Sequence, residues 1–180
     1  QKLAITEEEL KTRTILRGEK GKPYFAFSDA EGGGQTEKRP IHYSVSHSGN
    51  WWGCLMSEEP VGFDLEQYHD KTDHIKIAKR YFTEAEYQYA LQEGLDGFFE
   101  IWVRKEAYVK FLGLGLSKGL DSFSVIKDGK LSSVVIGVRN EDGQSPPCRI
   151  EGCLIQNGVK AAYCSSSGKQ IKSVIPIGIV

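Results

Sequence analysis

Two stretches of helical periodicity, with strand-like sequence on either side, most strongly limit the folds open to this chain. The helical period covers residues 73–93 and returns over residues 98–112, where Gly113 ends it. Thr83 and Glu86 form a capping box, so a new helix is expected to begin at Thr83. The order of strands, then helices, then strands predicts an α+β fold.

The strand-like stretches are short and are separated by turn residues. Those before the helices cover residues 42–45, 51–56 and 61–66, and those after them cover residues 123–126, 131–138, 149–155 and 159–164. Asp128-Gly129 and Asn157-Gly158 are dipeptides typical of tight hairpin turns. The second helical stretch carries an apolar stripe that predicts its buried face: Phe98, Ile101, Trp102, Val109 and Leu112.

Length and composition indicate an ordinary globular protein. The chain has 180 residues, enough for one large domain or two small lobes. Its hydrophobic share of 39% and charged share of 26% are unlike those of disordered or fibrous chains, and a net charge of −1 gives no overall basic field to recruit nucleic acid. We expect no membrane span and no signal peptide, because apolar runs are short. The four cysteines lack metal-binding spacing and are expected to be reduced, buried thiols in a cytosolic protein.

Asp64 and Glu66 are the first candidates for chemistry. In a strand, residues two apart share a face, so both carboxylates are expected on one side, with Phe63 and Leu65 on the other. Two neighbouring carboxylates repel each other unless a proton or a cation lies between them, and oxygen ligands of this kind suit Mg²⁺. Taken alone, the pair also fits the solvated edge of a strand.

Three further patterns are weak when each is taken alone. Glu106 and Lys110 stand four residues apart on one helical face, which is the usual spacing of a surface ion pair. The segment 44–49 places hydroxyl groups around His47, as in phosphate sites and also in ordinary turns. Residues 21–23 combine a glycine, a cation and a rigid turn, which is a common tripeptide.

In chain order, these patterns together resemble a known family. They are Gly-Lys-Pro at 21–23, Ser-Val-Ser-His-Ser-Gly at 44–49, Gly-Phe-Asp-Leu-Glu at 62–66, Phe-Thr-x-x-Glu at 82–86 and Trp-x-x-Lys-Glu-Ala-x-x-Lys-x-x-Gly-x-Gly-Leu at 102–116. The set is similar to that of the Sfp-type 4′-phosphopantetheinyl transferases, in the holo-carrier-protein synthase superfamily. The resemblance covers at least residues 21–125, and the last motif is its most diagnostic part.

The resemblance implies a reaction and a metal site. The implied activity is Mg²⁺-dependent transfer of 4′-phosphopantetheine from coenzyme A to a serine of an acyl or peptidyl carrier protein, with release of 3′,5′-ADP. Asp64, Glu66 and Glu106 would bind the metal. Either Glu86 or Glu106 would accept the proton of the carrier serine, although the capping box also explains Glu86 completely.

The resemblance also assigns residues to coenzyme A. Lys110 would reach the pyrophosphate, and Ser46 and His47 would contact phosphate oxygens. Lys110 and His47 would stabilise the charge that grows on the leaving phosphate. The segment beside the adenine and the 3′-phosphate would consist of Gly21, Lys22 and Pro23.

The family's fold implies two similar α/β lobes in a pseudo-twofold arrangement, with coenzyme A in the cleft between them. In this chain the lobes would be residues 1–63 and 64–180, the second carrying the metal site. Only 20 residues precede Gly21, several dozen fewer than in typical members, so the N-terminal lobe is expected to be incomplete. Because both motif sets lie in one polypeptide, a monomer is expected.

Two other classes of function stay open at this point. A different Mg²⁺-dependent phosphoryl or phosphodiester enzyme could use three carboxylates, but it would leave Lys110 and His47 without a common purpose. A binding module that has lost turnover would keep the fold and the contact with a carrier protein. In either carrier-binding case, the docking surface is expected near Phe98 and Phe99 and on the helix after Thr83.

Overall fold

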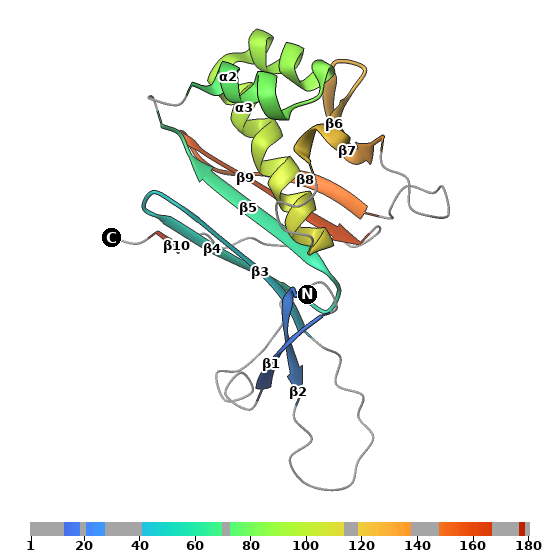
Figure 1. The fold of residues 1–180 in the computed structure, drawn as a ribbon. Coiled ribbons are helices and arrows are strands. Elements are labelled where there is room, and N and C mark those ends of the chain that lie inside the picture. The colour runs from blue at the N-terminus through green and yellow to red at the C-terminus, as the bar shows by residue number, and fades with distance from the viewer. Residues whose placement is uncertain are drawn as a thin grey trace, which may run out of the picture.

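The helices and strands follow the order expected from the sequence. The structure is a computed structural model that describes residues 13–18, 21–27, 41–69, 73–113, 119–137, 148–166 and 177–178. Two α-helices, α2 (His74–Tyr81) and α3 (Glu84–Leu112), stand between a first and a second block of strands in these ranges (Figure 1). All described strand pairs are antiparallel. The mixed helix-and-sheet class is therefore confirmed, whereas the division into two similar lobes stays a prediction.

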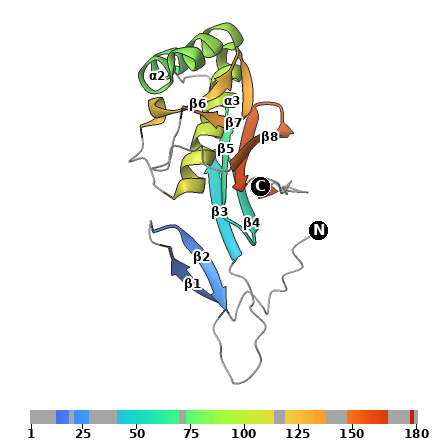
Figure 2. The same cartoon turned by 90° about the vertical axis from the view of Figure 1, so that its right-hand side faces the viewer.

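Strands β1 to β4 of the first block form a five-stranded sheet with β10, the last strand of the chain, in the order β1-β2-β3-β4-β10. Its strands are β1 (Arg13–Arg17), β2 (Pro23–Phe27), β3 (Ile41–Ser48), β4 (Trp51–Ser57) and the short β10 (Ile177–Gly178). The hairpin of β1 and β2 projects from one end of the molecule (Figures 1 and 2). Gly49 and Asn50 form the turn between β3 and β4.

A second sheet has the order β5-β9-β8. Its strands are β5 (Val61–Gln67), β9 (Val159–Ser166) and β8 (Cys148–Gln156), and a separate hairpin consists of β6 (Ser124–Lys127) and β7 (Lys130–Ile136). The predicted turns at Asp128-Gly129 and Asn157-Gly158 join β6 to β7 and β8 to β9. The expected domain boundary between residues 63 and 64 lies inside β5.

The capping box at the start of α3 is present as predicted. The Thr83 hydroxyl accepts from the backbone N–H of Glu86, and the Glu86 carboxylate accepts from the backbone N–H of Thr83 at 2.9 Å. The first helical stretch of the sequence is divided between α2 and the start of α3. Helix α3 continues into the second stretch, with Gly94 at φ 65° and ψ −146° marking a kink between the two. Gly113 ends the helix in a left-handed conformation, at φ 68°.

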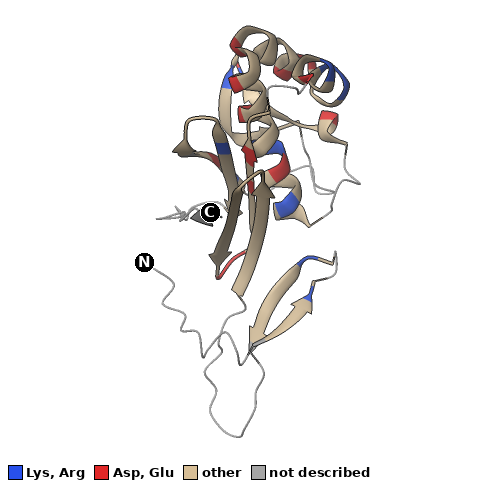
Figure 3. Cartoon of the chain, turned by 90° about the vertical axis from the view of Figure 1, so that its left-hand side faces the viewer, with Lys and Arg blue, Asp and Glu red and all other residues tan. Residues whose placement is uncertain are grey.

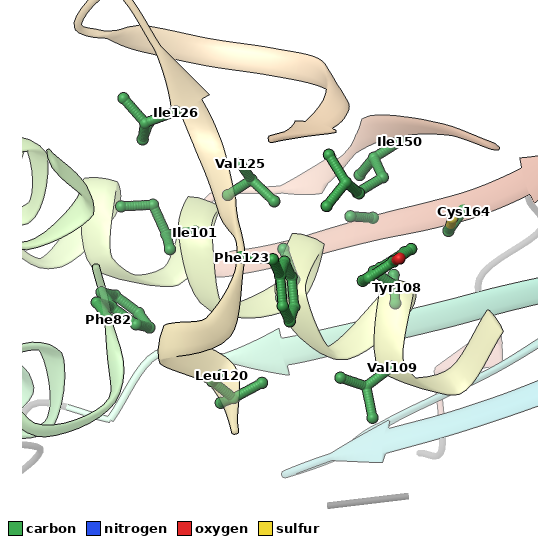
Figure 4. Close-up of a cluster of buried hydrophobic side chains, with 14 of the residues drawn as sticks. Phe82, Ile101, Tyr108, Val109, Leu120, Phe123, Val125, Ile126, Ile150 and Cys164 are labelled. Carbon is green, nitrogen blue, oxygen red and sulfur yellow. The ribbon is translucent and has the colours of Figure 1, made fainter. Parts of the chain in front are cut away.

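The sheet of β5, β9 and β8 has a hydrophobic core on each face. On one face lie α3 and β6, with Tyr108 meeting the ring of Phe123 edge-on at a centroid distance of 4.8 Å (Figure 4). On the other face Phe63 and Leu65 pack with Leu55 of β4. The predicted alternation along β5 is confirmed, because its odd-numbered residues face β4 while its even-numbered residues face α3.

Docking of a carrier on the helix after Thr83 stays a prediction, but the expected exposure of Phe98 and Phe99 is wrong. Their side chains are only 2% and 4% exposed. Phe98 stacks on both Phe82 and Trp102, which are also neighbours of each other, and Phe99 stacks on Tyr68 at a centroid distance of 4.7 Å. Of the predicted apolar stripe, Phe98, Ile101 and Val109 are buried, whereas Trp102 and Leu112 are half-buried at the margin of the core.

All four cysteines are free thiols, as predicted. Cys148 and Cys164 are buried, but Cys54 and Cys153 are only half-buried, so the expectation of burial is confirmed for one pair. Neither α2 nor α3, the helices within the described ranges, is long and apolar enough to cross a membrane.

The seating of α3 on β5 leads to a first prediction. A Cβ atom added at Gly62 would overlap the Ala107 carbonyl oxygen and the Phe111 nitrogen, and it would lie 2.9 Å from the Phe111 Cα. These are backbone atoms of α3, which cannot move aside without shifting the whole helix. Gly62→Ala should therefore lower the free energy of unfolding by about 2–3 kcal/mol, measured by urea denaturation.

Gly18→Ala is the matched control. Its added Cβ would be 3.7 Å from the carbonyl oxygen of Lys22, an ordinary van der Waals distance. This variant should change the free energy of unfolding by less than about 0.5 kcal/mol. Equal effects at the two positions would show that α3 does not rest closely on β5.

Candidate active site

A cavity of about 460 Å³ gathers most of the predicted site residues. It lies where α3 passes β5 and β3, and Figure 3 shows acidic positions on both the strand and the helix in this part of the molecule. Its lining contains the three predicted carboxylates, one lysine and one histidine. The lining residues are Val45, Ser46, His47, Asp64, Glu66, Trp102, Glu106 and Lys110. Residues 114–116 of the last motif lie outside the described residues.

Strand β3 contributes Val45, Ser46 and His47 to one wall of this cavity, and a row of serines joins the strand to β5. Ser44, Ser46 and Ser48 share the buried face of β3, as alternate residues of a strand must. No backbone ladder between β3 and β5 is recorded for the described residues, and the serine hydroxyls bridge the two strands instead. Ser44 accepts from the Phe63 backbone N–H at 2.9 Å, and Ser46 donates to Asp64 Oδ1 at 2.8 Å.

Asp64 is the most buried carboxylate of the cavity, and only one of its oxygens is engaged. Oδ1 lies 2.7 Å from the Lys110 ammonium and accepts from Ser46, whereas Oδ2 is buried with no partner. Burial raises the pKa of Asp64 to about 6, which shows that desolvation outweighs the attraction of Lys110. Repulsion from Glu66 acts in the same direction as burial.

Glu106, on the helix side of the cavity, also has an unpartnered carboxylate oxygen and a raised pKa. Its Oε1 is buried with no hydrogen-bond partner. Burial raises the pKa of Glu106, and the charges of Asp64 and Glu66 add to the effect. The i,i+4 pair expected with Lys110 is not formed, because the Lys110 ammonium reaches across to Asp64 and to Ser46 at 3.0 Å.

The donor set fits a hard divalent cation. Asp64 Oδ2 and Glu106 Oε1 are unpartnered anionic oxygens in one partly buried cavity, and Mg²⁺ prefers such ligands. Among the described residues, however, no three acidic, histidine or cysteine side chains are already drawn together as a ready metal cluster. Lys110 supplies the positive charge at Asp64 in this structure, so a metal would share Asp64 with Lys110 or displace it.

Residues 21–23 do not line the cavity. Gly21 and Lys22 lie in the connection from β1 to β2, where Gly21 has a φ of 79°, and Pro23 is the first residue of β2. The Lys22 ammonium donates to the backbone carbonyl of Val61 and, at 3.4 Å, to that of Phe111 in the last turn of α3. Burial lowers the pKa of Lys22 to about 8. Lys22 thus ties the β1–β2 hairpin to the start of β5 and the end of α3.

Glu86 does not line the cavity, and its role as a proton acceptor stays a prediction. The side chain is fully buried, and its two oxygens lie 2.7 and 2.6 Å from the Lys105 ammonium. Oε1 also accepts from the Val125 backbone N–H at 2.8 Å, and Oε2 accepts from Thr83. Because its accepting positions face the core, Glu86 holds α3 to β6.

Sequence reasoning missed Lys105, the partner of Glu86. Its ammonium donates to both Glu86 oxygens and to the Phe123 carbonyl at 2.5 Å, and burial lowers its pKa. The signal was present in the helical spacing. Lys105 follows Ile101 by four residues and precedes Tyr108 by three, so it falls on the buried face of α3.

Comparison with known proteins identifies the family of this chain. Residues 60–164 match the model of the 4′-phosphopantetheinyl transferase superfamily. The chain is 37% identical over 131 residues to 4′-phosphopantetheinyl transferase Sfp of Bacillus subtilis (strain 168), which covers 69% of this chain and 55% of that protein. It is 32% identical over 169 residues to 4′-phosphopantetheinyl transferase gsp of Aneurinibacillus migulanus, covering 92% and 62%.

The chain belongs to the 4′-phosphopantetheinyl transferase superfamily. Within it, the two relatives named above place the chain with the Sfp-type proteins. A more distant relative is 4′-phosphopantetheinyl transferase AcpT of Escherichia coli (strain K12), 33% identical over 104 residues, covering 55% of this chain and 48% of that protein. The chain spans less than two thirds of the length of each of these relatives.

The buried ion pair leads to a prediction about stability. Lys105→Met should lower the free energy of unfolding by about 3–5 kcal/mol, because it leaves the Glu86 carboxylate buried without its cation. The double variant Glu86→Gln/Lys105→Met should cost less than the sum of the single changes. Urea denaturation of the four proteins gives this coupling energy directly.

Lys76→Met is the control for the ion pair. Lys76 pairs with Asp73 at 3.5 Å, but the two side chains are 85% and 64% exposed. Its removal should cost less than about 1 kcal/mol. A similar loss for Lys76→Met and Lys105→Met would contradict the structural role of the buried pair.

The raised pKa of Asp64 predicts that Asp64→Asn increases the free energy of unfolding by an amount that depends on pH. An ordinary aspartate has a pKa of 3.8, and that of Asp64 is about 6, so the folded state binds the extra proton between these values. The resulting stabilisation is complete below pH 4 and is lost as the pH rises through 6. In EDTA, Asp64→Asn should therefore be more stable than the wild type by about 2–3 kcal/mol at pH 7.5, with a smaller difference at pH 4.5.

Thermal or urea unfolding at the two pH values measures this gain. Asp128→Asn is the control, because Asp128 is exposed in the β6–β7 turn and the change should have little effect at either pH. A wild type more stable than Asp64→Asn at pH 7.5 in EDTA would show that Lys110 outweighs the burial of Asp64.

Proposed function

We propose that this chain transfers the 4′-phosphopantetheine group from coenzyme A to a serine of an acyl or peptidyl carrier protein, with Mg²⁺ and with release of 3′,5′-ADP. One observation carries the proposal. A single cavity holds three carboxylates from β5 and α3 together with Lys110 and His47, and two carboxylate oxygens in it have no partner. Membership of the transferase superfamily supports this reaction.

Asp64, Glu66 and Glu106 would hold the metal. Bound Mg²⁺ supplies positive charge that draws electron density from the pyrophosphate and from the phosphorus under attack. The raised pKa values of Asp64 and Glu106 support this assignment, since they show that the cavity disfavours the carboxylates until a cation compensates them.

Lys110, His47 and Ser46 would bind the phosphate oxygens. The Lys110 ammonium already reaches the cavity, held by Asp64 and Ser46, and the side chain of His47 is exposed along the same wall. On arrival of the pyrophosphate, Lys110 would exchange part of its contact with Asp64 for a phosphate oxygen. Lys110 and His47 would then stabilise the charge that develops on the leaving 3′,5′-ADP.

Glu106 would act as the proton acceptor. The serine oxygen of the carrier forms a bond to the β-phosphorus, the bond from that phosphorus to the departing phosphate oxygen breaks, and the serine proton passes to Glu106 directly or through water. Glu106 lies in the cavity, whereas Glu86 has its oxygens bound to Lys105, Thr83 and Val125. The location of the two residues favours Glu106 over Glu86 for this role.

The placement of Gly21, Lys22 and Pro23 beside the adenine and the 3′-phosphate stays a prediction. It requires the Lys22 ammonium to leave the carbonyls of Val61 and Phe111 when coenzyme A binds. The lowered pKa of Lys22 indicates that the two carbonyls do not fully replace the water that its ammonium loses on burial. A phosphate would stabilise the positive charge better.

The division into lobes, the oligomeric state and the location of the chain are also proposals. The first lobe would comprise residues 1–63 and the second residues 64–180, related by a pseudo-twofold arrangement. The chain would act as a monomer, without nucleic acid or membrane partners. Its four free thiols fit a reducing compartment, which supports the cytoplasm as its location.

Intact-mass spectrometry of an apo carrier protein tests the proposed reaction. After incubation with the wild-type chain, coenzyme A and Mg²⁺, the carrier should gain the mass of one phosphopantetheine group, and EDTA should prevent the gain. Glu66→Gln and Glu106→Gln should slow the transfer at least about 100-fold, because each removes a charged ligand of the metal. Glu58→Gln, an exposed carboxylate between β4 and β5, should transfer at the wild-type rate.

The outcomes separate the proposed reaction from its rivals. Binding of the carrier without any gain in mass would indicate a module that has lost turnover. Cleavage of coenzyme A without a carrier would indicate a different phosphoryl enzyme. Undiminished transfer by Glu66→Gln would remove the metal assignment.

A further inference from the structure

Ser48, at the end of β3, makes two hydrogen bonds that together hold Glu66. Its hydroxyl donates to Glu66 Oε2 at 2.5 Å and accepts from the Gln67 backbone N–H at 3.2 Å. The Ser48 side chain is buried, and Glu66 is the next carboxylate along β5 from Asp64. Ser48 therefore touches one of the three acidic residues of the cavity without itself lining the cavity.

The direction of these bonds follows from the chemistry of the groups. A backbone N–H can only donate, so the Ser48 oxygen accepts from Gln67. A hydroxyl has one hydrogen, and an ionised carboxylate can only accept, so that hydrogen goes to Glu66 Oε2. One oxygen of Glu66 is thereby fixed, and the rotation of its carboxylate is set by the position of Ser48.

The position of Ser48 is itself determined by the turn that follows it. The Gln67 side-chain oxygen accepts from the Asn50 backbone N–H at 3.2 Å. The same oxygen lies where a Cβ on Gly49 would be, and Gly49 has a φ of 57°, so the turn between β3 and β4 closes directly on Gln67. Gln67 thus fixes the end of β3 through both its backbone and its side chain, before any ligand binds.

The geometry points to Ser48 as a positioning residue for the metal site. It holds Oε2 of the Glu66 carboxylate, so that Glu66 would be oriented to bind a divalent cation together with Asp64 and Glu106. This inference rests on the proposed function of the cavity. Hydrogen-bond partners of metal ligands commonly change metal affinity about 10–100-fold when they are removed.

Ser44 provides a control within the same strand. It is equally buried and also bridges β3 to β5, but its partners are the backbone N–H and carbonyl of Phe63 rather than a carboxylate. Loss of either hydroxyl weakens the contact between the strands, and only loss of the Ser48 hydroxyl frees an acidic side chain. Ser46 is unsuitable as a control, because it contacts both Asp64 and Lys110.

Binding of Mn²⁺, followed by electron paramagnetic resonance, tests the inference without any need for turnover. Mn²⁺ stands in for Mg²⁺ because carboxylate ligands suit both ions. Ser48→Ala should weaken Mn²⁺ binding about 10-fold, Ser48→Thr should restore it to within about threefold of the wild type, and Ser44→Ala should leave it unchanged. In the transfer assay, Ser48→Ala should raise the Mg²⁺ concentration for half-maximal rate about 10-fold and change kcat at saturating Mg²⁺ by less than about threefold.

Each other outcome overturns a definite part of the argument. Wild-type affinity in Ser48→Ala, with metal-dependent transfer intact, removes the role of Ser48 and leaves the proposed function standing. Equal weakening by Ser48→Ala and Ser44→Ala, or no rescue by threonine, shows that the hydroxyls only hold the strands together. No Mn²⁺ binding by the wild-type chain refutes the proposed metal site and the role of Ser48 with it.

Discussion

The close approach of α3 to β5 at Gly62 is the contact on which the cavity depends. Gly62, Asp64 and Glu66 lie on the face of β5 that is turned toward α3. There is no space for a side chain between Gly62 and the helix backbone at Ala107 and Phe111. Those two helix residues directly follow Glu106 and Lys110 in the chain. The absent side chain therefore sets how near the helix carboxylate and lysine come to the strand carboxylates. The close approach of the helix also buries Asp64 and Glu106, and this burial raises their pKa values.

Two lysines of α3, five residues apart, show how similar ion pairs acquire different roles. Lys105 and Glu86 form a closed network in which each oxygen and the ammonium group have several partners. Lys110 engages one oxygen of Asp64 and leaves the other, like Glu106 Oε1, without a partner. A satisfied buried network stabilises a fold, whereas unsatisfied buried oxygens cost free energy that a ligand can recover. The difference favours a structural role for Glu86 and a chemical role for Asp64.

Local pattern predicted the features that depend on one element. The period of two along β5 placed Asp64 and Glu66 on one face, and the capping box placed the start of α3 at Thr83. Contacts between distant elements were not predictable in this way. Lys110 has a carboxylate one helical turn away at Glu106, yet it pairs with Asp64, 46 residues earlier. Similarly, nothing near Lys22 in the chain indicates that its ammonium meets the carbonyl of Phe111. The family resemblance joined these motifs only because it carries long-range information that periodicity lacks.

The serines of β3 explain why the carboxylates need a strand outside their own sheet. A backbone ladder between β3 and β5 would join the two strands but would leave the side chains of Asp64 and Glu66 unsupported. The serine hydroxyls both join the strands and bind those carboxylates, since Ser46 contacts Asp64 and Ser48 contacts Glu66. The outer face of β3 meanwhile carries Val45 and His47 into the cavity wall. Because one strand supplies both the wall and the hydrogen bonds, displacement of β3 would disturb the orientation of the acidic residues even if β5 and α3 kept their places.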